Sequence, residues 1–167
     1  MSPNTQLMTP LNLTAYTLVT ANGRGVGPVL QALRVRRSGL KPCDFEDVPL
    51  KTYIGRVEGL EDFSLGNELE RFDCRNNRLA WLGLQQDGFM VAVAEAKQRY
   101  GANRVAVVMG TSTSGILETE HAYQARDVAG SLPAWYTSRY RYTHNMFSLG
   151  HFVRACLWLR GPAMVIS

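Results

Sequence analysis

Four short segments of the chain have the hydrophobic pattern of strands. Residues 11–19 and 52–57 mix apolar, Thr and Tyr side chains and are followed by turn residues, which is typical of strands. Residues 105–109 and 163–167 are nearly unbroken apolar runs. Runs of this length are typical of strands buried on both faces, as in a parallel sheet between helices. The pattern therefore predicts two ordinary strands and two core strands.

Three longer segments carry apolar residues at helical spacing. Residues 28–37 form the first, and residues 77–100 form the longest, in which Gly88 predicts a kink. Residues 145–157 place one apolar stripe on a third helix, formed by Met146, Leu149, Val153 and Cys156. Because strands and helices alternate along the chain, we predict an α/β fold with right-handed crossovers.

The composition agrees with one globular domain. Of the 167 residues, 46% are hydrophobic and 19% are charged, which argues against disorder. The net charge of +4 is too small to predict a nucleic-acid partner. No apolar run approaches the roughly 20 residues of a membrane helix, and residues 1–10 lack a basic start followed by an apolar core. We therefore expect a cytoplasmic protein with no membrane partner.

The cysteines and histidines do not have the spacing of a metal site. Cys43, Cys74 and Cys156 are odd in number and far apart, which fits reduced thiols rather than a disulfide framework. No Cys-x-x-Cys pair occurs, and no histidine has zinc-type spacing to a cysteine. We expect no metal and no other cofactor.

Two glycine-rich turns are candidate phosphate sites, but both lack the required motif. Gly23, Gly25 and Gly27 follow a predicted strand without the spacing of a dinucleotide fingerprint. The Ser/Thr-rich loop at 110–115 leads into a further expected helix, but it lacks the Gly-Lys-Ser/Thr ending of a P-loop. From the residues alone, the chain is an α/β domain of unspecified activity.

The last residues of the chain resemble those of a known family. Leu159-Arg-Gly-Pro162 followed by residues 163–167 resembles the stretch that leads into the active-site cysteine of β-ketoacyl-acyl-carrier-protein synthases. Other blocks agree with this family in order and spacing, and they are residues 18–27, 30–40, 107–115 and 145–150. The chain departs from the family at Arg24 and Val26, where a Ser-Pro pair is usual, at 76–78, where Asn-Asn-Arg replaces the common Met-Asp-Arg, and in the Tyr- and Arg-rich residues 130–145.

The resemblance implies a thiolase-like fold, in which this chain is one half of a two-half layered α/β architecture with a mixed sheet between helices. It identifies residues 1–167 as the amino-terminal domain of a synthase, truncated just before the expected cysteine segment. The parent enzyme would catalyse a decarboxylating Claisen condensation in fatty-acid or polyketide-type chain elongation, using a cysteine at a helix amino-terminus and two histidines. None of these catalytic residues lies within 1–167, so the fragment alone is expected to be inactive.

Two alternatives to an active synthase stay open. The parent can be a chain length factor, which resembles synthases throughout, lacks the cysteine and works in a heterodimer. The fragment can also be the product of a broken gene. Cys156 is not the expected nucleophile, because it lies on the apolar stripe of a predicted helix and is interpreted as a buried structural cysteine.

The resemblance also implies binding residues. Ser112 and Thr113 match the acyl-pocket loop of the family, although their hydroxyls can equally bond their own turn. Arg71, Arg75 and Arg78 are candidates for docking an acidic acyl carrier protein, with exposed helix-start arginines as the alternative.

The family further implies a dimer, either a homodimer or a heterodimer with a synthase-like partner. The last strand would pair with its two-fold mate, and aromatic side chains before it would join the interface. The candidate interface residues are Trp135, Tyr136, Tyr140, Tyr142, Val165 and Ile166. An ordinary surface loop is the alternative for the aromatic segment.

Overall fold

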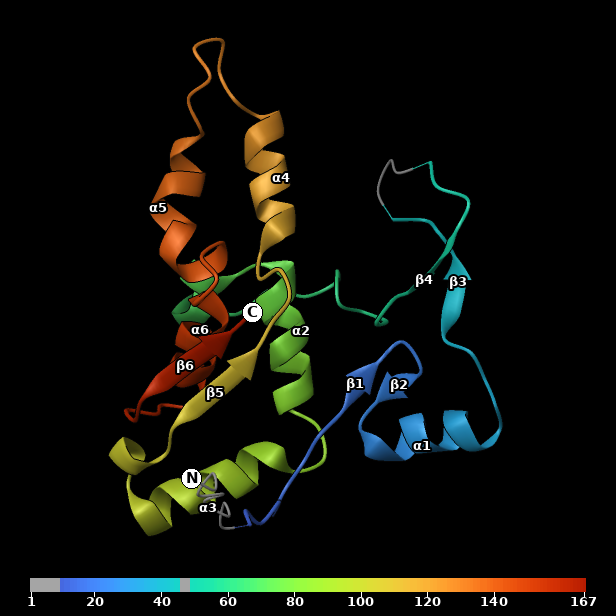
Figure 1. Ribbon diagram of the computed structural model, residues 1–167, viewed down its shortest axis with the longest axis vertical. Coiled ribbons are helices and arrows are strands. Elements are labelled where there is room, and N and C mark those ends of the chain that lie inside the picture. The colour runs from blue at the N-terminus through green and yellow to red at the C-terminus, as the bar shows by residue number, and fades with distance from the viewer. Residues whose placement is uncertain (1–9, 46–48) are drawn as a thin grey trace, which may run out of the picture.

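The computed structural model describes residues 10–45 and 49–167. The expectation that residues 1–10 carry no secretory leader therefore falls almost wholly outside the described residues. Within them, the elements follow in the order β1 (Val19–Thr20), β2 (Gly23–Arg24), α1 (Val26–Arg34), β3 (Leu40–Pro42), β4 (Tyr53–Gly55), 3-10 helix η1 (Asn67–Phe72), α2 (Arg75–Leu84), α3 (Phe89–Tyr100), 3-10 helix η2 (Ala102–Arg104), β5 (Val107–Gly110), α4 (Ile116–Gln124), α5 (Ala134–Thr143), α6 (Ser148–Cys156) and β6 (Ala163–Ile166). Figure 1 shows β1 to β4 and α1 on one side of the molecule, and β5, β6 and α6 on the other.

The two apolar runs form a parallel pair of strands, as predicted. The register of β5 and β6 joins Val107 to Ala163 and Gly110 to Ile166. One face of the pair packs against α6, since a methyl group added at Gly150 would lie 2.7 Å from Cγ2 of Val165. A glycine at this position lets the helix approach the strand closely.

The other face of this pair corrects the prediction that both faces are buried. Val108 is 65% exposed, Met164 is 59% exposed and Ile166 is 60% exposed. Side chains alternate between the two faces of a strand, and within the described residues only one face is covered by a helix.

The hydrophobic core surrounds α6. Phe152 is fully buried, and its ring centroid lies 5.8 Å from that of Phe72 and 6.5 Å from that of Trp81. The predicted stripe is confirmed for three of its members, and the core cluster comprises Leu65, Phe72, Val107, Leu149, Phe152, Val153, Cys156, Leu157 and Leu159. Met146 precedes the helix and is half exposed.

The long helix expected at 77–100 is two helices, so that prediction is wrong about continuity and right about an interruption at Gly88. α2 ends at Leu84 and α3 begins at Phe89. Asp87 and Gly88 between them have left-handed φ values of 55° and 70°. The Asp87 carboxylate accepts hydrogen bonds from the Val26 backbone N–H at 3.0 and 3.1 Å, which caps the start of α1.

The amino-terminal region contains less strand than the pattern predicts. Of the expected strand at 11–19, only Val19 belongs to a paired strand, in the short antiparallel hairpin of β1 and β2. The strand predicted at 52–57 is confirmed as β4, which pairs antiparallel with β3. Leu11 is 91% exposed and Leu13 is 81% exposed, because none of the described strands pairs with residues 11–18.

The Tyr- and Arg-rich segment is part of a helical hairpin. α4 and α5 run side by side and project from the body of the molecule (Figure 1).

The described strands of the molecule pair as three two-stranded sheets, one parallel and two antiparallel. Parallel and antiparallel pairing therefore both occur in this α/β fold.

Among residues 10–45 and 49–167, no helix combines the length and the apolar character needed to cross a membrane. The same residues hold no group of three or more His, Cys, Asp or Glu side chains arranged around a metal ion.

Candidate functional site

The candidate site is the loop that joins β5 to α4. Parallel pairing continues one step beyond the strands, because the Thr111 N–H donates to the Ile166 carbonyl at 3.0 Å. The Ser167 hydroxyl then donates to the carbonyl of Ser112 at 3.4 Å. The carboxyl end of β6 therefore lies against this loop, at the edge of the sheet where α/β folds place ligands.

A buried hydroxyl network holds the loop in place. Ser114 has a left-handed φ of 51°, and its Oγ lies 2.8 Å from the Oγ of Ser148. The same hydroxyl donates to the carbonyl of Asn145 at 3.0 Å. Ser148 is fully buried at the start of α6. Because buried hydroxyls are costly to leave unpaired, this network ties the loop to α6.

Gly115 lets the loop approach α5. A methyl group at this position would collide with the carbonyl oxygen of Thr143. His144, which follows Thr143, is buried and stacks on Tyr136 with ring centroids 4.3 Å apart. Burial lowers the pKa of His144, and the charge of Arg139 lowers it further.

A cavity of about 330 Å³ lies beside the loop. It places Thr113 next to Arg75, although the sequence assigned these residues to different roles. Ser112 is exposed and is not among the residues that line the cavity, which are Phe45, Arg75, Asn76, Leu79, Thr113, Ser114, Gly115, Ile116, Leu117, Glu118 and Glu120. Of the two neighbouring residues expected at an acyl pocket, Thr113 therefore lines this cavity and Ser112 does not.

The three arginines expected at a carrier-docking surface have different surroundings. Arg71 stacks over Phe72 and Tyr142 at 5.0 and 5.1 Å. Arg75 pairs with Glu61 at 3.0 Å and borders the cavity beside Thr113. Arg78 is partly buried and pairs with Asp73.

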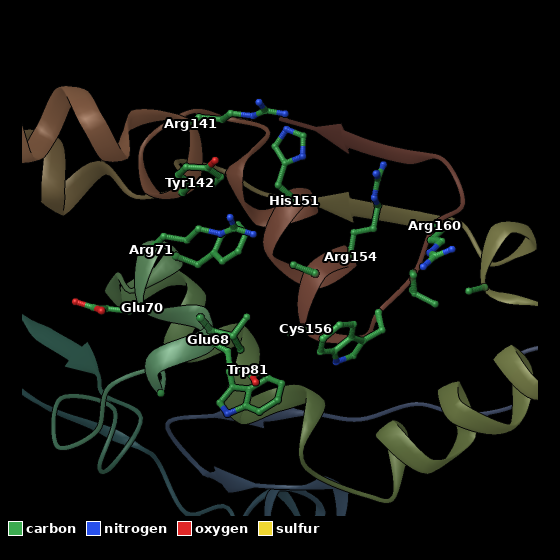
Figure 2. Close-up of a pocket in the computed structure, with 17 residues that line it drawn as sticks. Glu68, Glu70, Arg71, Trp81, Arg141, Tyr142, His151, Arg154, Cys156 and Arg160 are labelled. Atoms are coloured by element: carbon green, nitrogen blue, oxygen red, sulfur yellow. The ribbon is translucent and has the colours of Figure 1, made fainter.

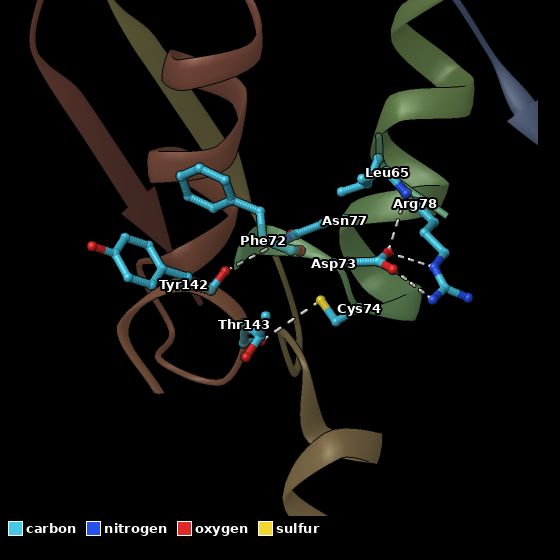
Figure 3. Close-up of polar contacts among 8 residues, drawn as sticks. All are labelled: Leu65, Phe72, Asp73, Cys74, Asn77, Arg78, Tyr142 and Thr143. Carbon is cyan, nitrogen blue, oxygen red and sulfur yellow. Dashed lines mark hydrogen bonds and ion pairs between the residues drawn. The ribbon is translucent and has the colours of Figure 1, made fainter. Parts of the chain in front are cut away.

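Arg78 forms a two-point ion pair with Asp73 (Figure 3). The guanidinium donates to the two carboxylate oxygens at 2.6 and 2.9 Å, and the hydrogen bond to Asp73 raises the pKa of Arg78. Asn77, which is fully buried, donates to the backbone carbonyls of Phe72 and Tyr142. Asn77 thus joins the start of α2 to the end of α5, whereas Arg78 holds Asp73, which lies between η1 and α2.

Burial makes two of the cysteines poor nucleophiles. It raises the pKa of the Cys74 thiol to about 11 and that of the Cys156 thiol to about 12. Since the thiolate is the reactive form, neither sulfur is activated. Cys156 contributes to the core around α6, as the sequence pattern indicated.

The six candidate dimer residues divide between the interior and the surface. Tyr136 is buried, Tyr142 packs edge-to-face on Phe72 at 5.2 Å, and Val165 faces Gly150 of α6. The remaining three are exposed, and they are Trp135, Tyr140 and Ile166.

Sequence reasoning missed a second, larger concavity. A groove of about 1380 Å³ lies between η1 and α6, and Figure 2 shows Arg141, His151, Arg154 and Arg160 along its α6 side. The spacing of His151 and Arg154, which places both on one face of α6, is the signal that could have indicated it.

No protein-family model matches the chain, and no curated protein matches it in sequence. A solved structure does match: a ketosynthase (ApeO) in complex with its chain length factor (ApeC), from Xenorhabdus doucetiae. The TM-score is 0.59 with 22% sequence identity, and the match covers 88% of this chain and 36% of that chain. The chain thus spans about a third of the length of the structure it resembles. Its α/β fold is thiolase-like, of the ketosynthase type.

Proposed function

We propose that this chain is the amino-terminal part of a β-ketoacyl-acyl-carrier-protein synthase that catalyses a decarboxylating Claisen condensation. One observation carries the proposal: the end of β6 lies against Thr111 and Ser112, and the rest of the same loop, residues 113–115, lines a cavity. In the family that the sequence resembles, the nucleophilic cysteine follows this strand. A cysteine placed there would be next to the candidate acyl pocket, where a helix amino-terminus lowers a thiol pKa.

Covalent acylation tests this proposal. The full-length protein is incubated with an acyl-carrier thioester, and its intact mass is measured. We expect one acyl group on a cysteine beyond Ser167. Residues 1–167 with Cys43→Ser serve as the control and should stay unmodified, because the two remaining cysteines, Cys74 and Cys156, are buried with raised pKa values. Acylation of the fragment would overturn the assignment of the nucleophile.

A chain length factor is the second candidate function. The solved structure that resembles this chain supports this candidate as well, because it contains a ketosynthase together with its chain length factor. The codons that follow Ser167 distinguish the two candidates. A cysteine in the segment after β6 supports a synthase. Its absence, together with a complex formed only with a synthase-like partner, supports a chain length factor.

The proposed acyl pocket is supported by the position of Thr113 on the cavity wall. Thr113→Phe in the full-length enzyme should shorten the acyl chains it accepts, because the added ring occupies the cavity. Thr137→Phe on exposed α5 is the matched control and should leave the product profile unchanged. An unchanged profile in both variants would contradict the pocket assignment, and Ser112 would lose its proposed role with it.

The proposed carrier docking is best tested with Arg71→Glu combined with Arg75→Glu. Arg78 is kept in this test, because reversing its charge would also break its ion pair with Asp73. We expect the Michaelis constant for acyl carrier protein to rise at low salt, where rim charges act most strongly. Arg99→Glu with Arg104→Glu makes the same charge change on α3 and η2 and should have no effect. Equal effects of the two pairs would rule out a specific docking role.

The proposed dimer is supported by the exposed Trp135, Tyr140 and Ile166 and by the free edge of β6 among the described strands. Tyr140→Asp should shift the full-length protein towards monomer in analytical ultracentrifugation at micromolar concentration. Tyr123→Asp on α4 is the control, because Tyr123 is 50% exposed and Tyr140 is 46% exposed. A folded dimer in both variants would remove α5 from the interface.

A further inference from the structure

The hydroxyl of Ser148, at the start of α6, reaches the loop at 111–115 through Ser114. The two Oγ atoms lie 2.8 Å apart, and the Ser114 Oγ also lies 3.0 Å from the carbonyl oxygen of Asn145. A carbonyl oxygen only accepts, and a serine hydroxyl has one hydrogen to donate. Ser114 therefore donates to Asn145, and Ser148 donates to Ser114. The direction of the hydrogen bonds makes Ser148 the residue that holds Ser114.

The backbone of Ser114 depends on being held. Its φ of 51° lies in the left-handed region, which is unfavourable for a residue with a side chain. Such a conformation persists only where surrounding contacts stabilise it. Besides the two contacts of its hydroxyl, the Ser114 N–H donates to the Oγ1 of Thr111 at 3.3 Å. The contact with Ser148 is the shortest of these three, so its loss would favour relaxation of the loop.

The same turn of α6 also contacts β6. Gly150 follows Ser148 by two residues, and a methyl group added there would lie 2.7 Å from Cγ2 of Val165. The loop itself contacts the end of β6, because the Thr111 N–H donates to the Ile166 carbonyl. These contacts join described elements to one another in the interior, so they do not depend on what covers the outer faces. The start of α6 thus fixes the loop and the end of β6 relative to each other.

Ser148 does not itself line the cavity beside the loop, whereas Thr113 and Ser114 do. Ser148 is fully buried, so its effect on a chain held in the cavity is indirect. We propose that Ser148 is a positioning residue: its hydroxyl holds Ser114, keeps Thr113 in the wall of the acyl pocket and so limits the length of the accepted acyl chain. This role rests on the proposed function and adds to it a specificity residue outside the pocket.

Acylation of the full-length protein by two chain lengths tests this role. The probes are octanoyl- and palmitoyl-carrier thioesters, and intact mass gives kcat/KM for each. Ser148→Ala removes only the oxygen atom, and the loop is then free to move away from the cavity. We expect the ratio of palmitoyl to octanoyl kcat/KM to rise about threefold or more. A smaller change in this ratio would overturn the role of Ser148.

Two further variants separate positioning from a loss of stability. Val153→Ala removes a core side chain from the same helix and should lower stability, yet it should change the ratio less than about 1.5-fold. Ser114→Ala should raise the ratio as Ser148→Ala does, and it provides a second test if the latter variant does not fold. The double variant should add nothing to either single change, because Ser148 acts through Ser114. Effects that multiply, or an equal effect of Val153→Ala, would contradict positioning through Ser114.

Amide hydrogen exchange measures the hold on the loop without any activity. Residues 111–115 of the full-length protein should exchange about tenfold faster in Ser148→Ala than in the wild type or in Val153→Ala. Unchanged exchange would show that Ser148 does not hold the loop. If the wild type is not acylated, the proposed function fails and the specificity role of Ser148 fails with it. An acylated wild type with an unchanged ratio in Ser148→Ala would overturn only the role of Ser148.

Discussion

α1 and α6 are helices of nine residues each, both amphipathic, and they have very different surroundings. α6 buries six residues, including Phe152 and Val153, between β5, β6, α2 and α5. α1 buries only Val29 and Ala32, while Leu33 remains 61% exposed. Two helices with similar sequence patterns are therefore buried to different extents, because the burial of a side chain depends on the elements that the fold packs against it.

The same contrast extends to the two regions that contain these helices. The region around α6 holds the core cluster and the buried hydroxyl and amide contacts. The amino-terminal region holds short antiparallel pairs and many exposed apolar side chains, including Leu11, Leu13, Leu18, Leu30, Leu33, Val35, Leu40 and Tyr53. We infer that the α6 region supplies most of the stability of the described chain.

The largest expected effect comes from the centre of the α6 region. Phe152→Ala should lower the free energy of unfolding by about 3–5 kcal/mol, since it removes a fully buried ring and leaves a cavity. Leu33→Ala in α1 should cost under about 1 kcal/mol, because that side chain is mostly exposed. Urea denaturation of both variants measures the difference. Similar costs would show that the two regions contribute equally.

Two glycines allow a matched comparison of backbone packing. Gly115→Ala should destabilise the protein by about 1–3 kcal/mol, because the methyl group collides with the carbonyl of Thr143. Gly27→Ala in α1 should stabilise it by about 0.5–1 kcal/mol, because nothing lies within 4 Å of the added atom and Gly is a poor helix former. Thermal melts measure the expected decrease in stability for Gly115→Ala and the expected increase for Gly27→Ala. Stabilisation by Gly115→Ala would contradict the close contact.

The two regions also differ in their ion pairs. Asp73→Asn should cost about 1–2 kcal/mol, because it weakens two charge-assisted hydrogen bonds to the partly buried Arg78. Asp44→Asn, which removes the partner of Arg56, should cost less than about 1 kcal/mol, since Asp44 is 64% exposed and screened by water. Chemical denaturation at low and high salt measures the stability that each ion pair contributes. An equal salt dependence of the two variants would contradict the larger contribution expected from the Asp73–Arg78 pair.

The smallest effect concerns pH. Burial lowers the pKa of His144 in the folded state, so the unfolded chain binds a proton more readily. The stability contributed by neutral His144 is therefore present above the unfolded pKa of about 6.5 and is lost as pH falls below it through the folded pKa. His144→Phe keeps a ring against Tyr136 and should flatten the decline of stability between about pH 7 and pH 5. An unchanged slope in urea titrations would exclude His144 as its source.

The sequence itself determined the elements that depend on local periodicity. The helices at α1 and α6, the strand β4 and the parallel pair of β5 and β6 all follow from the spacing or continuity of apolar residues, and the loop at 111–115 follows from its small side chains. The resemblance in residues 159–167 pointed to the thiolase-like fold, which the structural likeness supports. The helices and strands could be predicted because neighbours in sequence create them, whereas the pairing of β5 with β6 joins residues far apart in the chain.

Only the tertiary structure decided how these elements are used. It divided residues 77–100 into two helices at Asp87 and Gly88, and it left one face of β6 exposed. It committed Arg78 to Asp73 and separated Ser112 from the cavity that Thr113 lines. It also gathered the arginines of α5, α6 and the loop before β6 in one groove. Burial, ion pairing and charge clustering depend on residues far apart in the chain, and their distances are set only when the whole chain has folded.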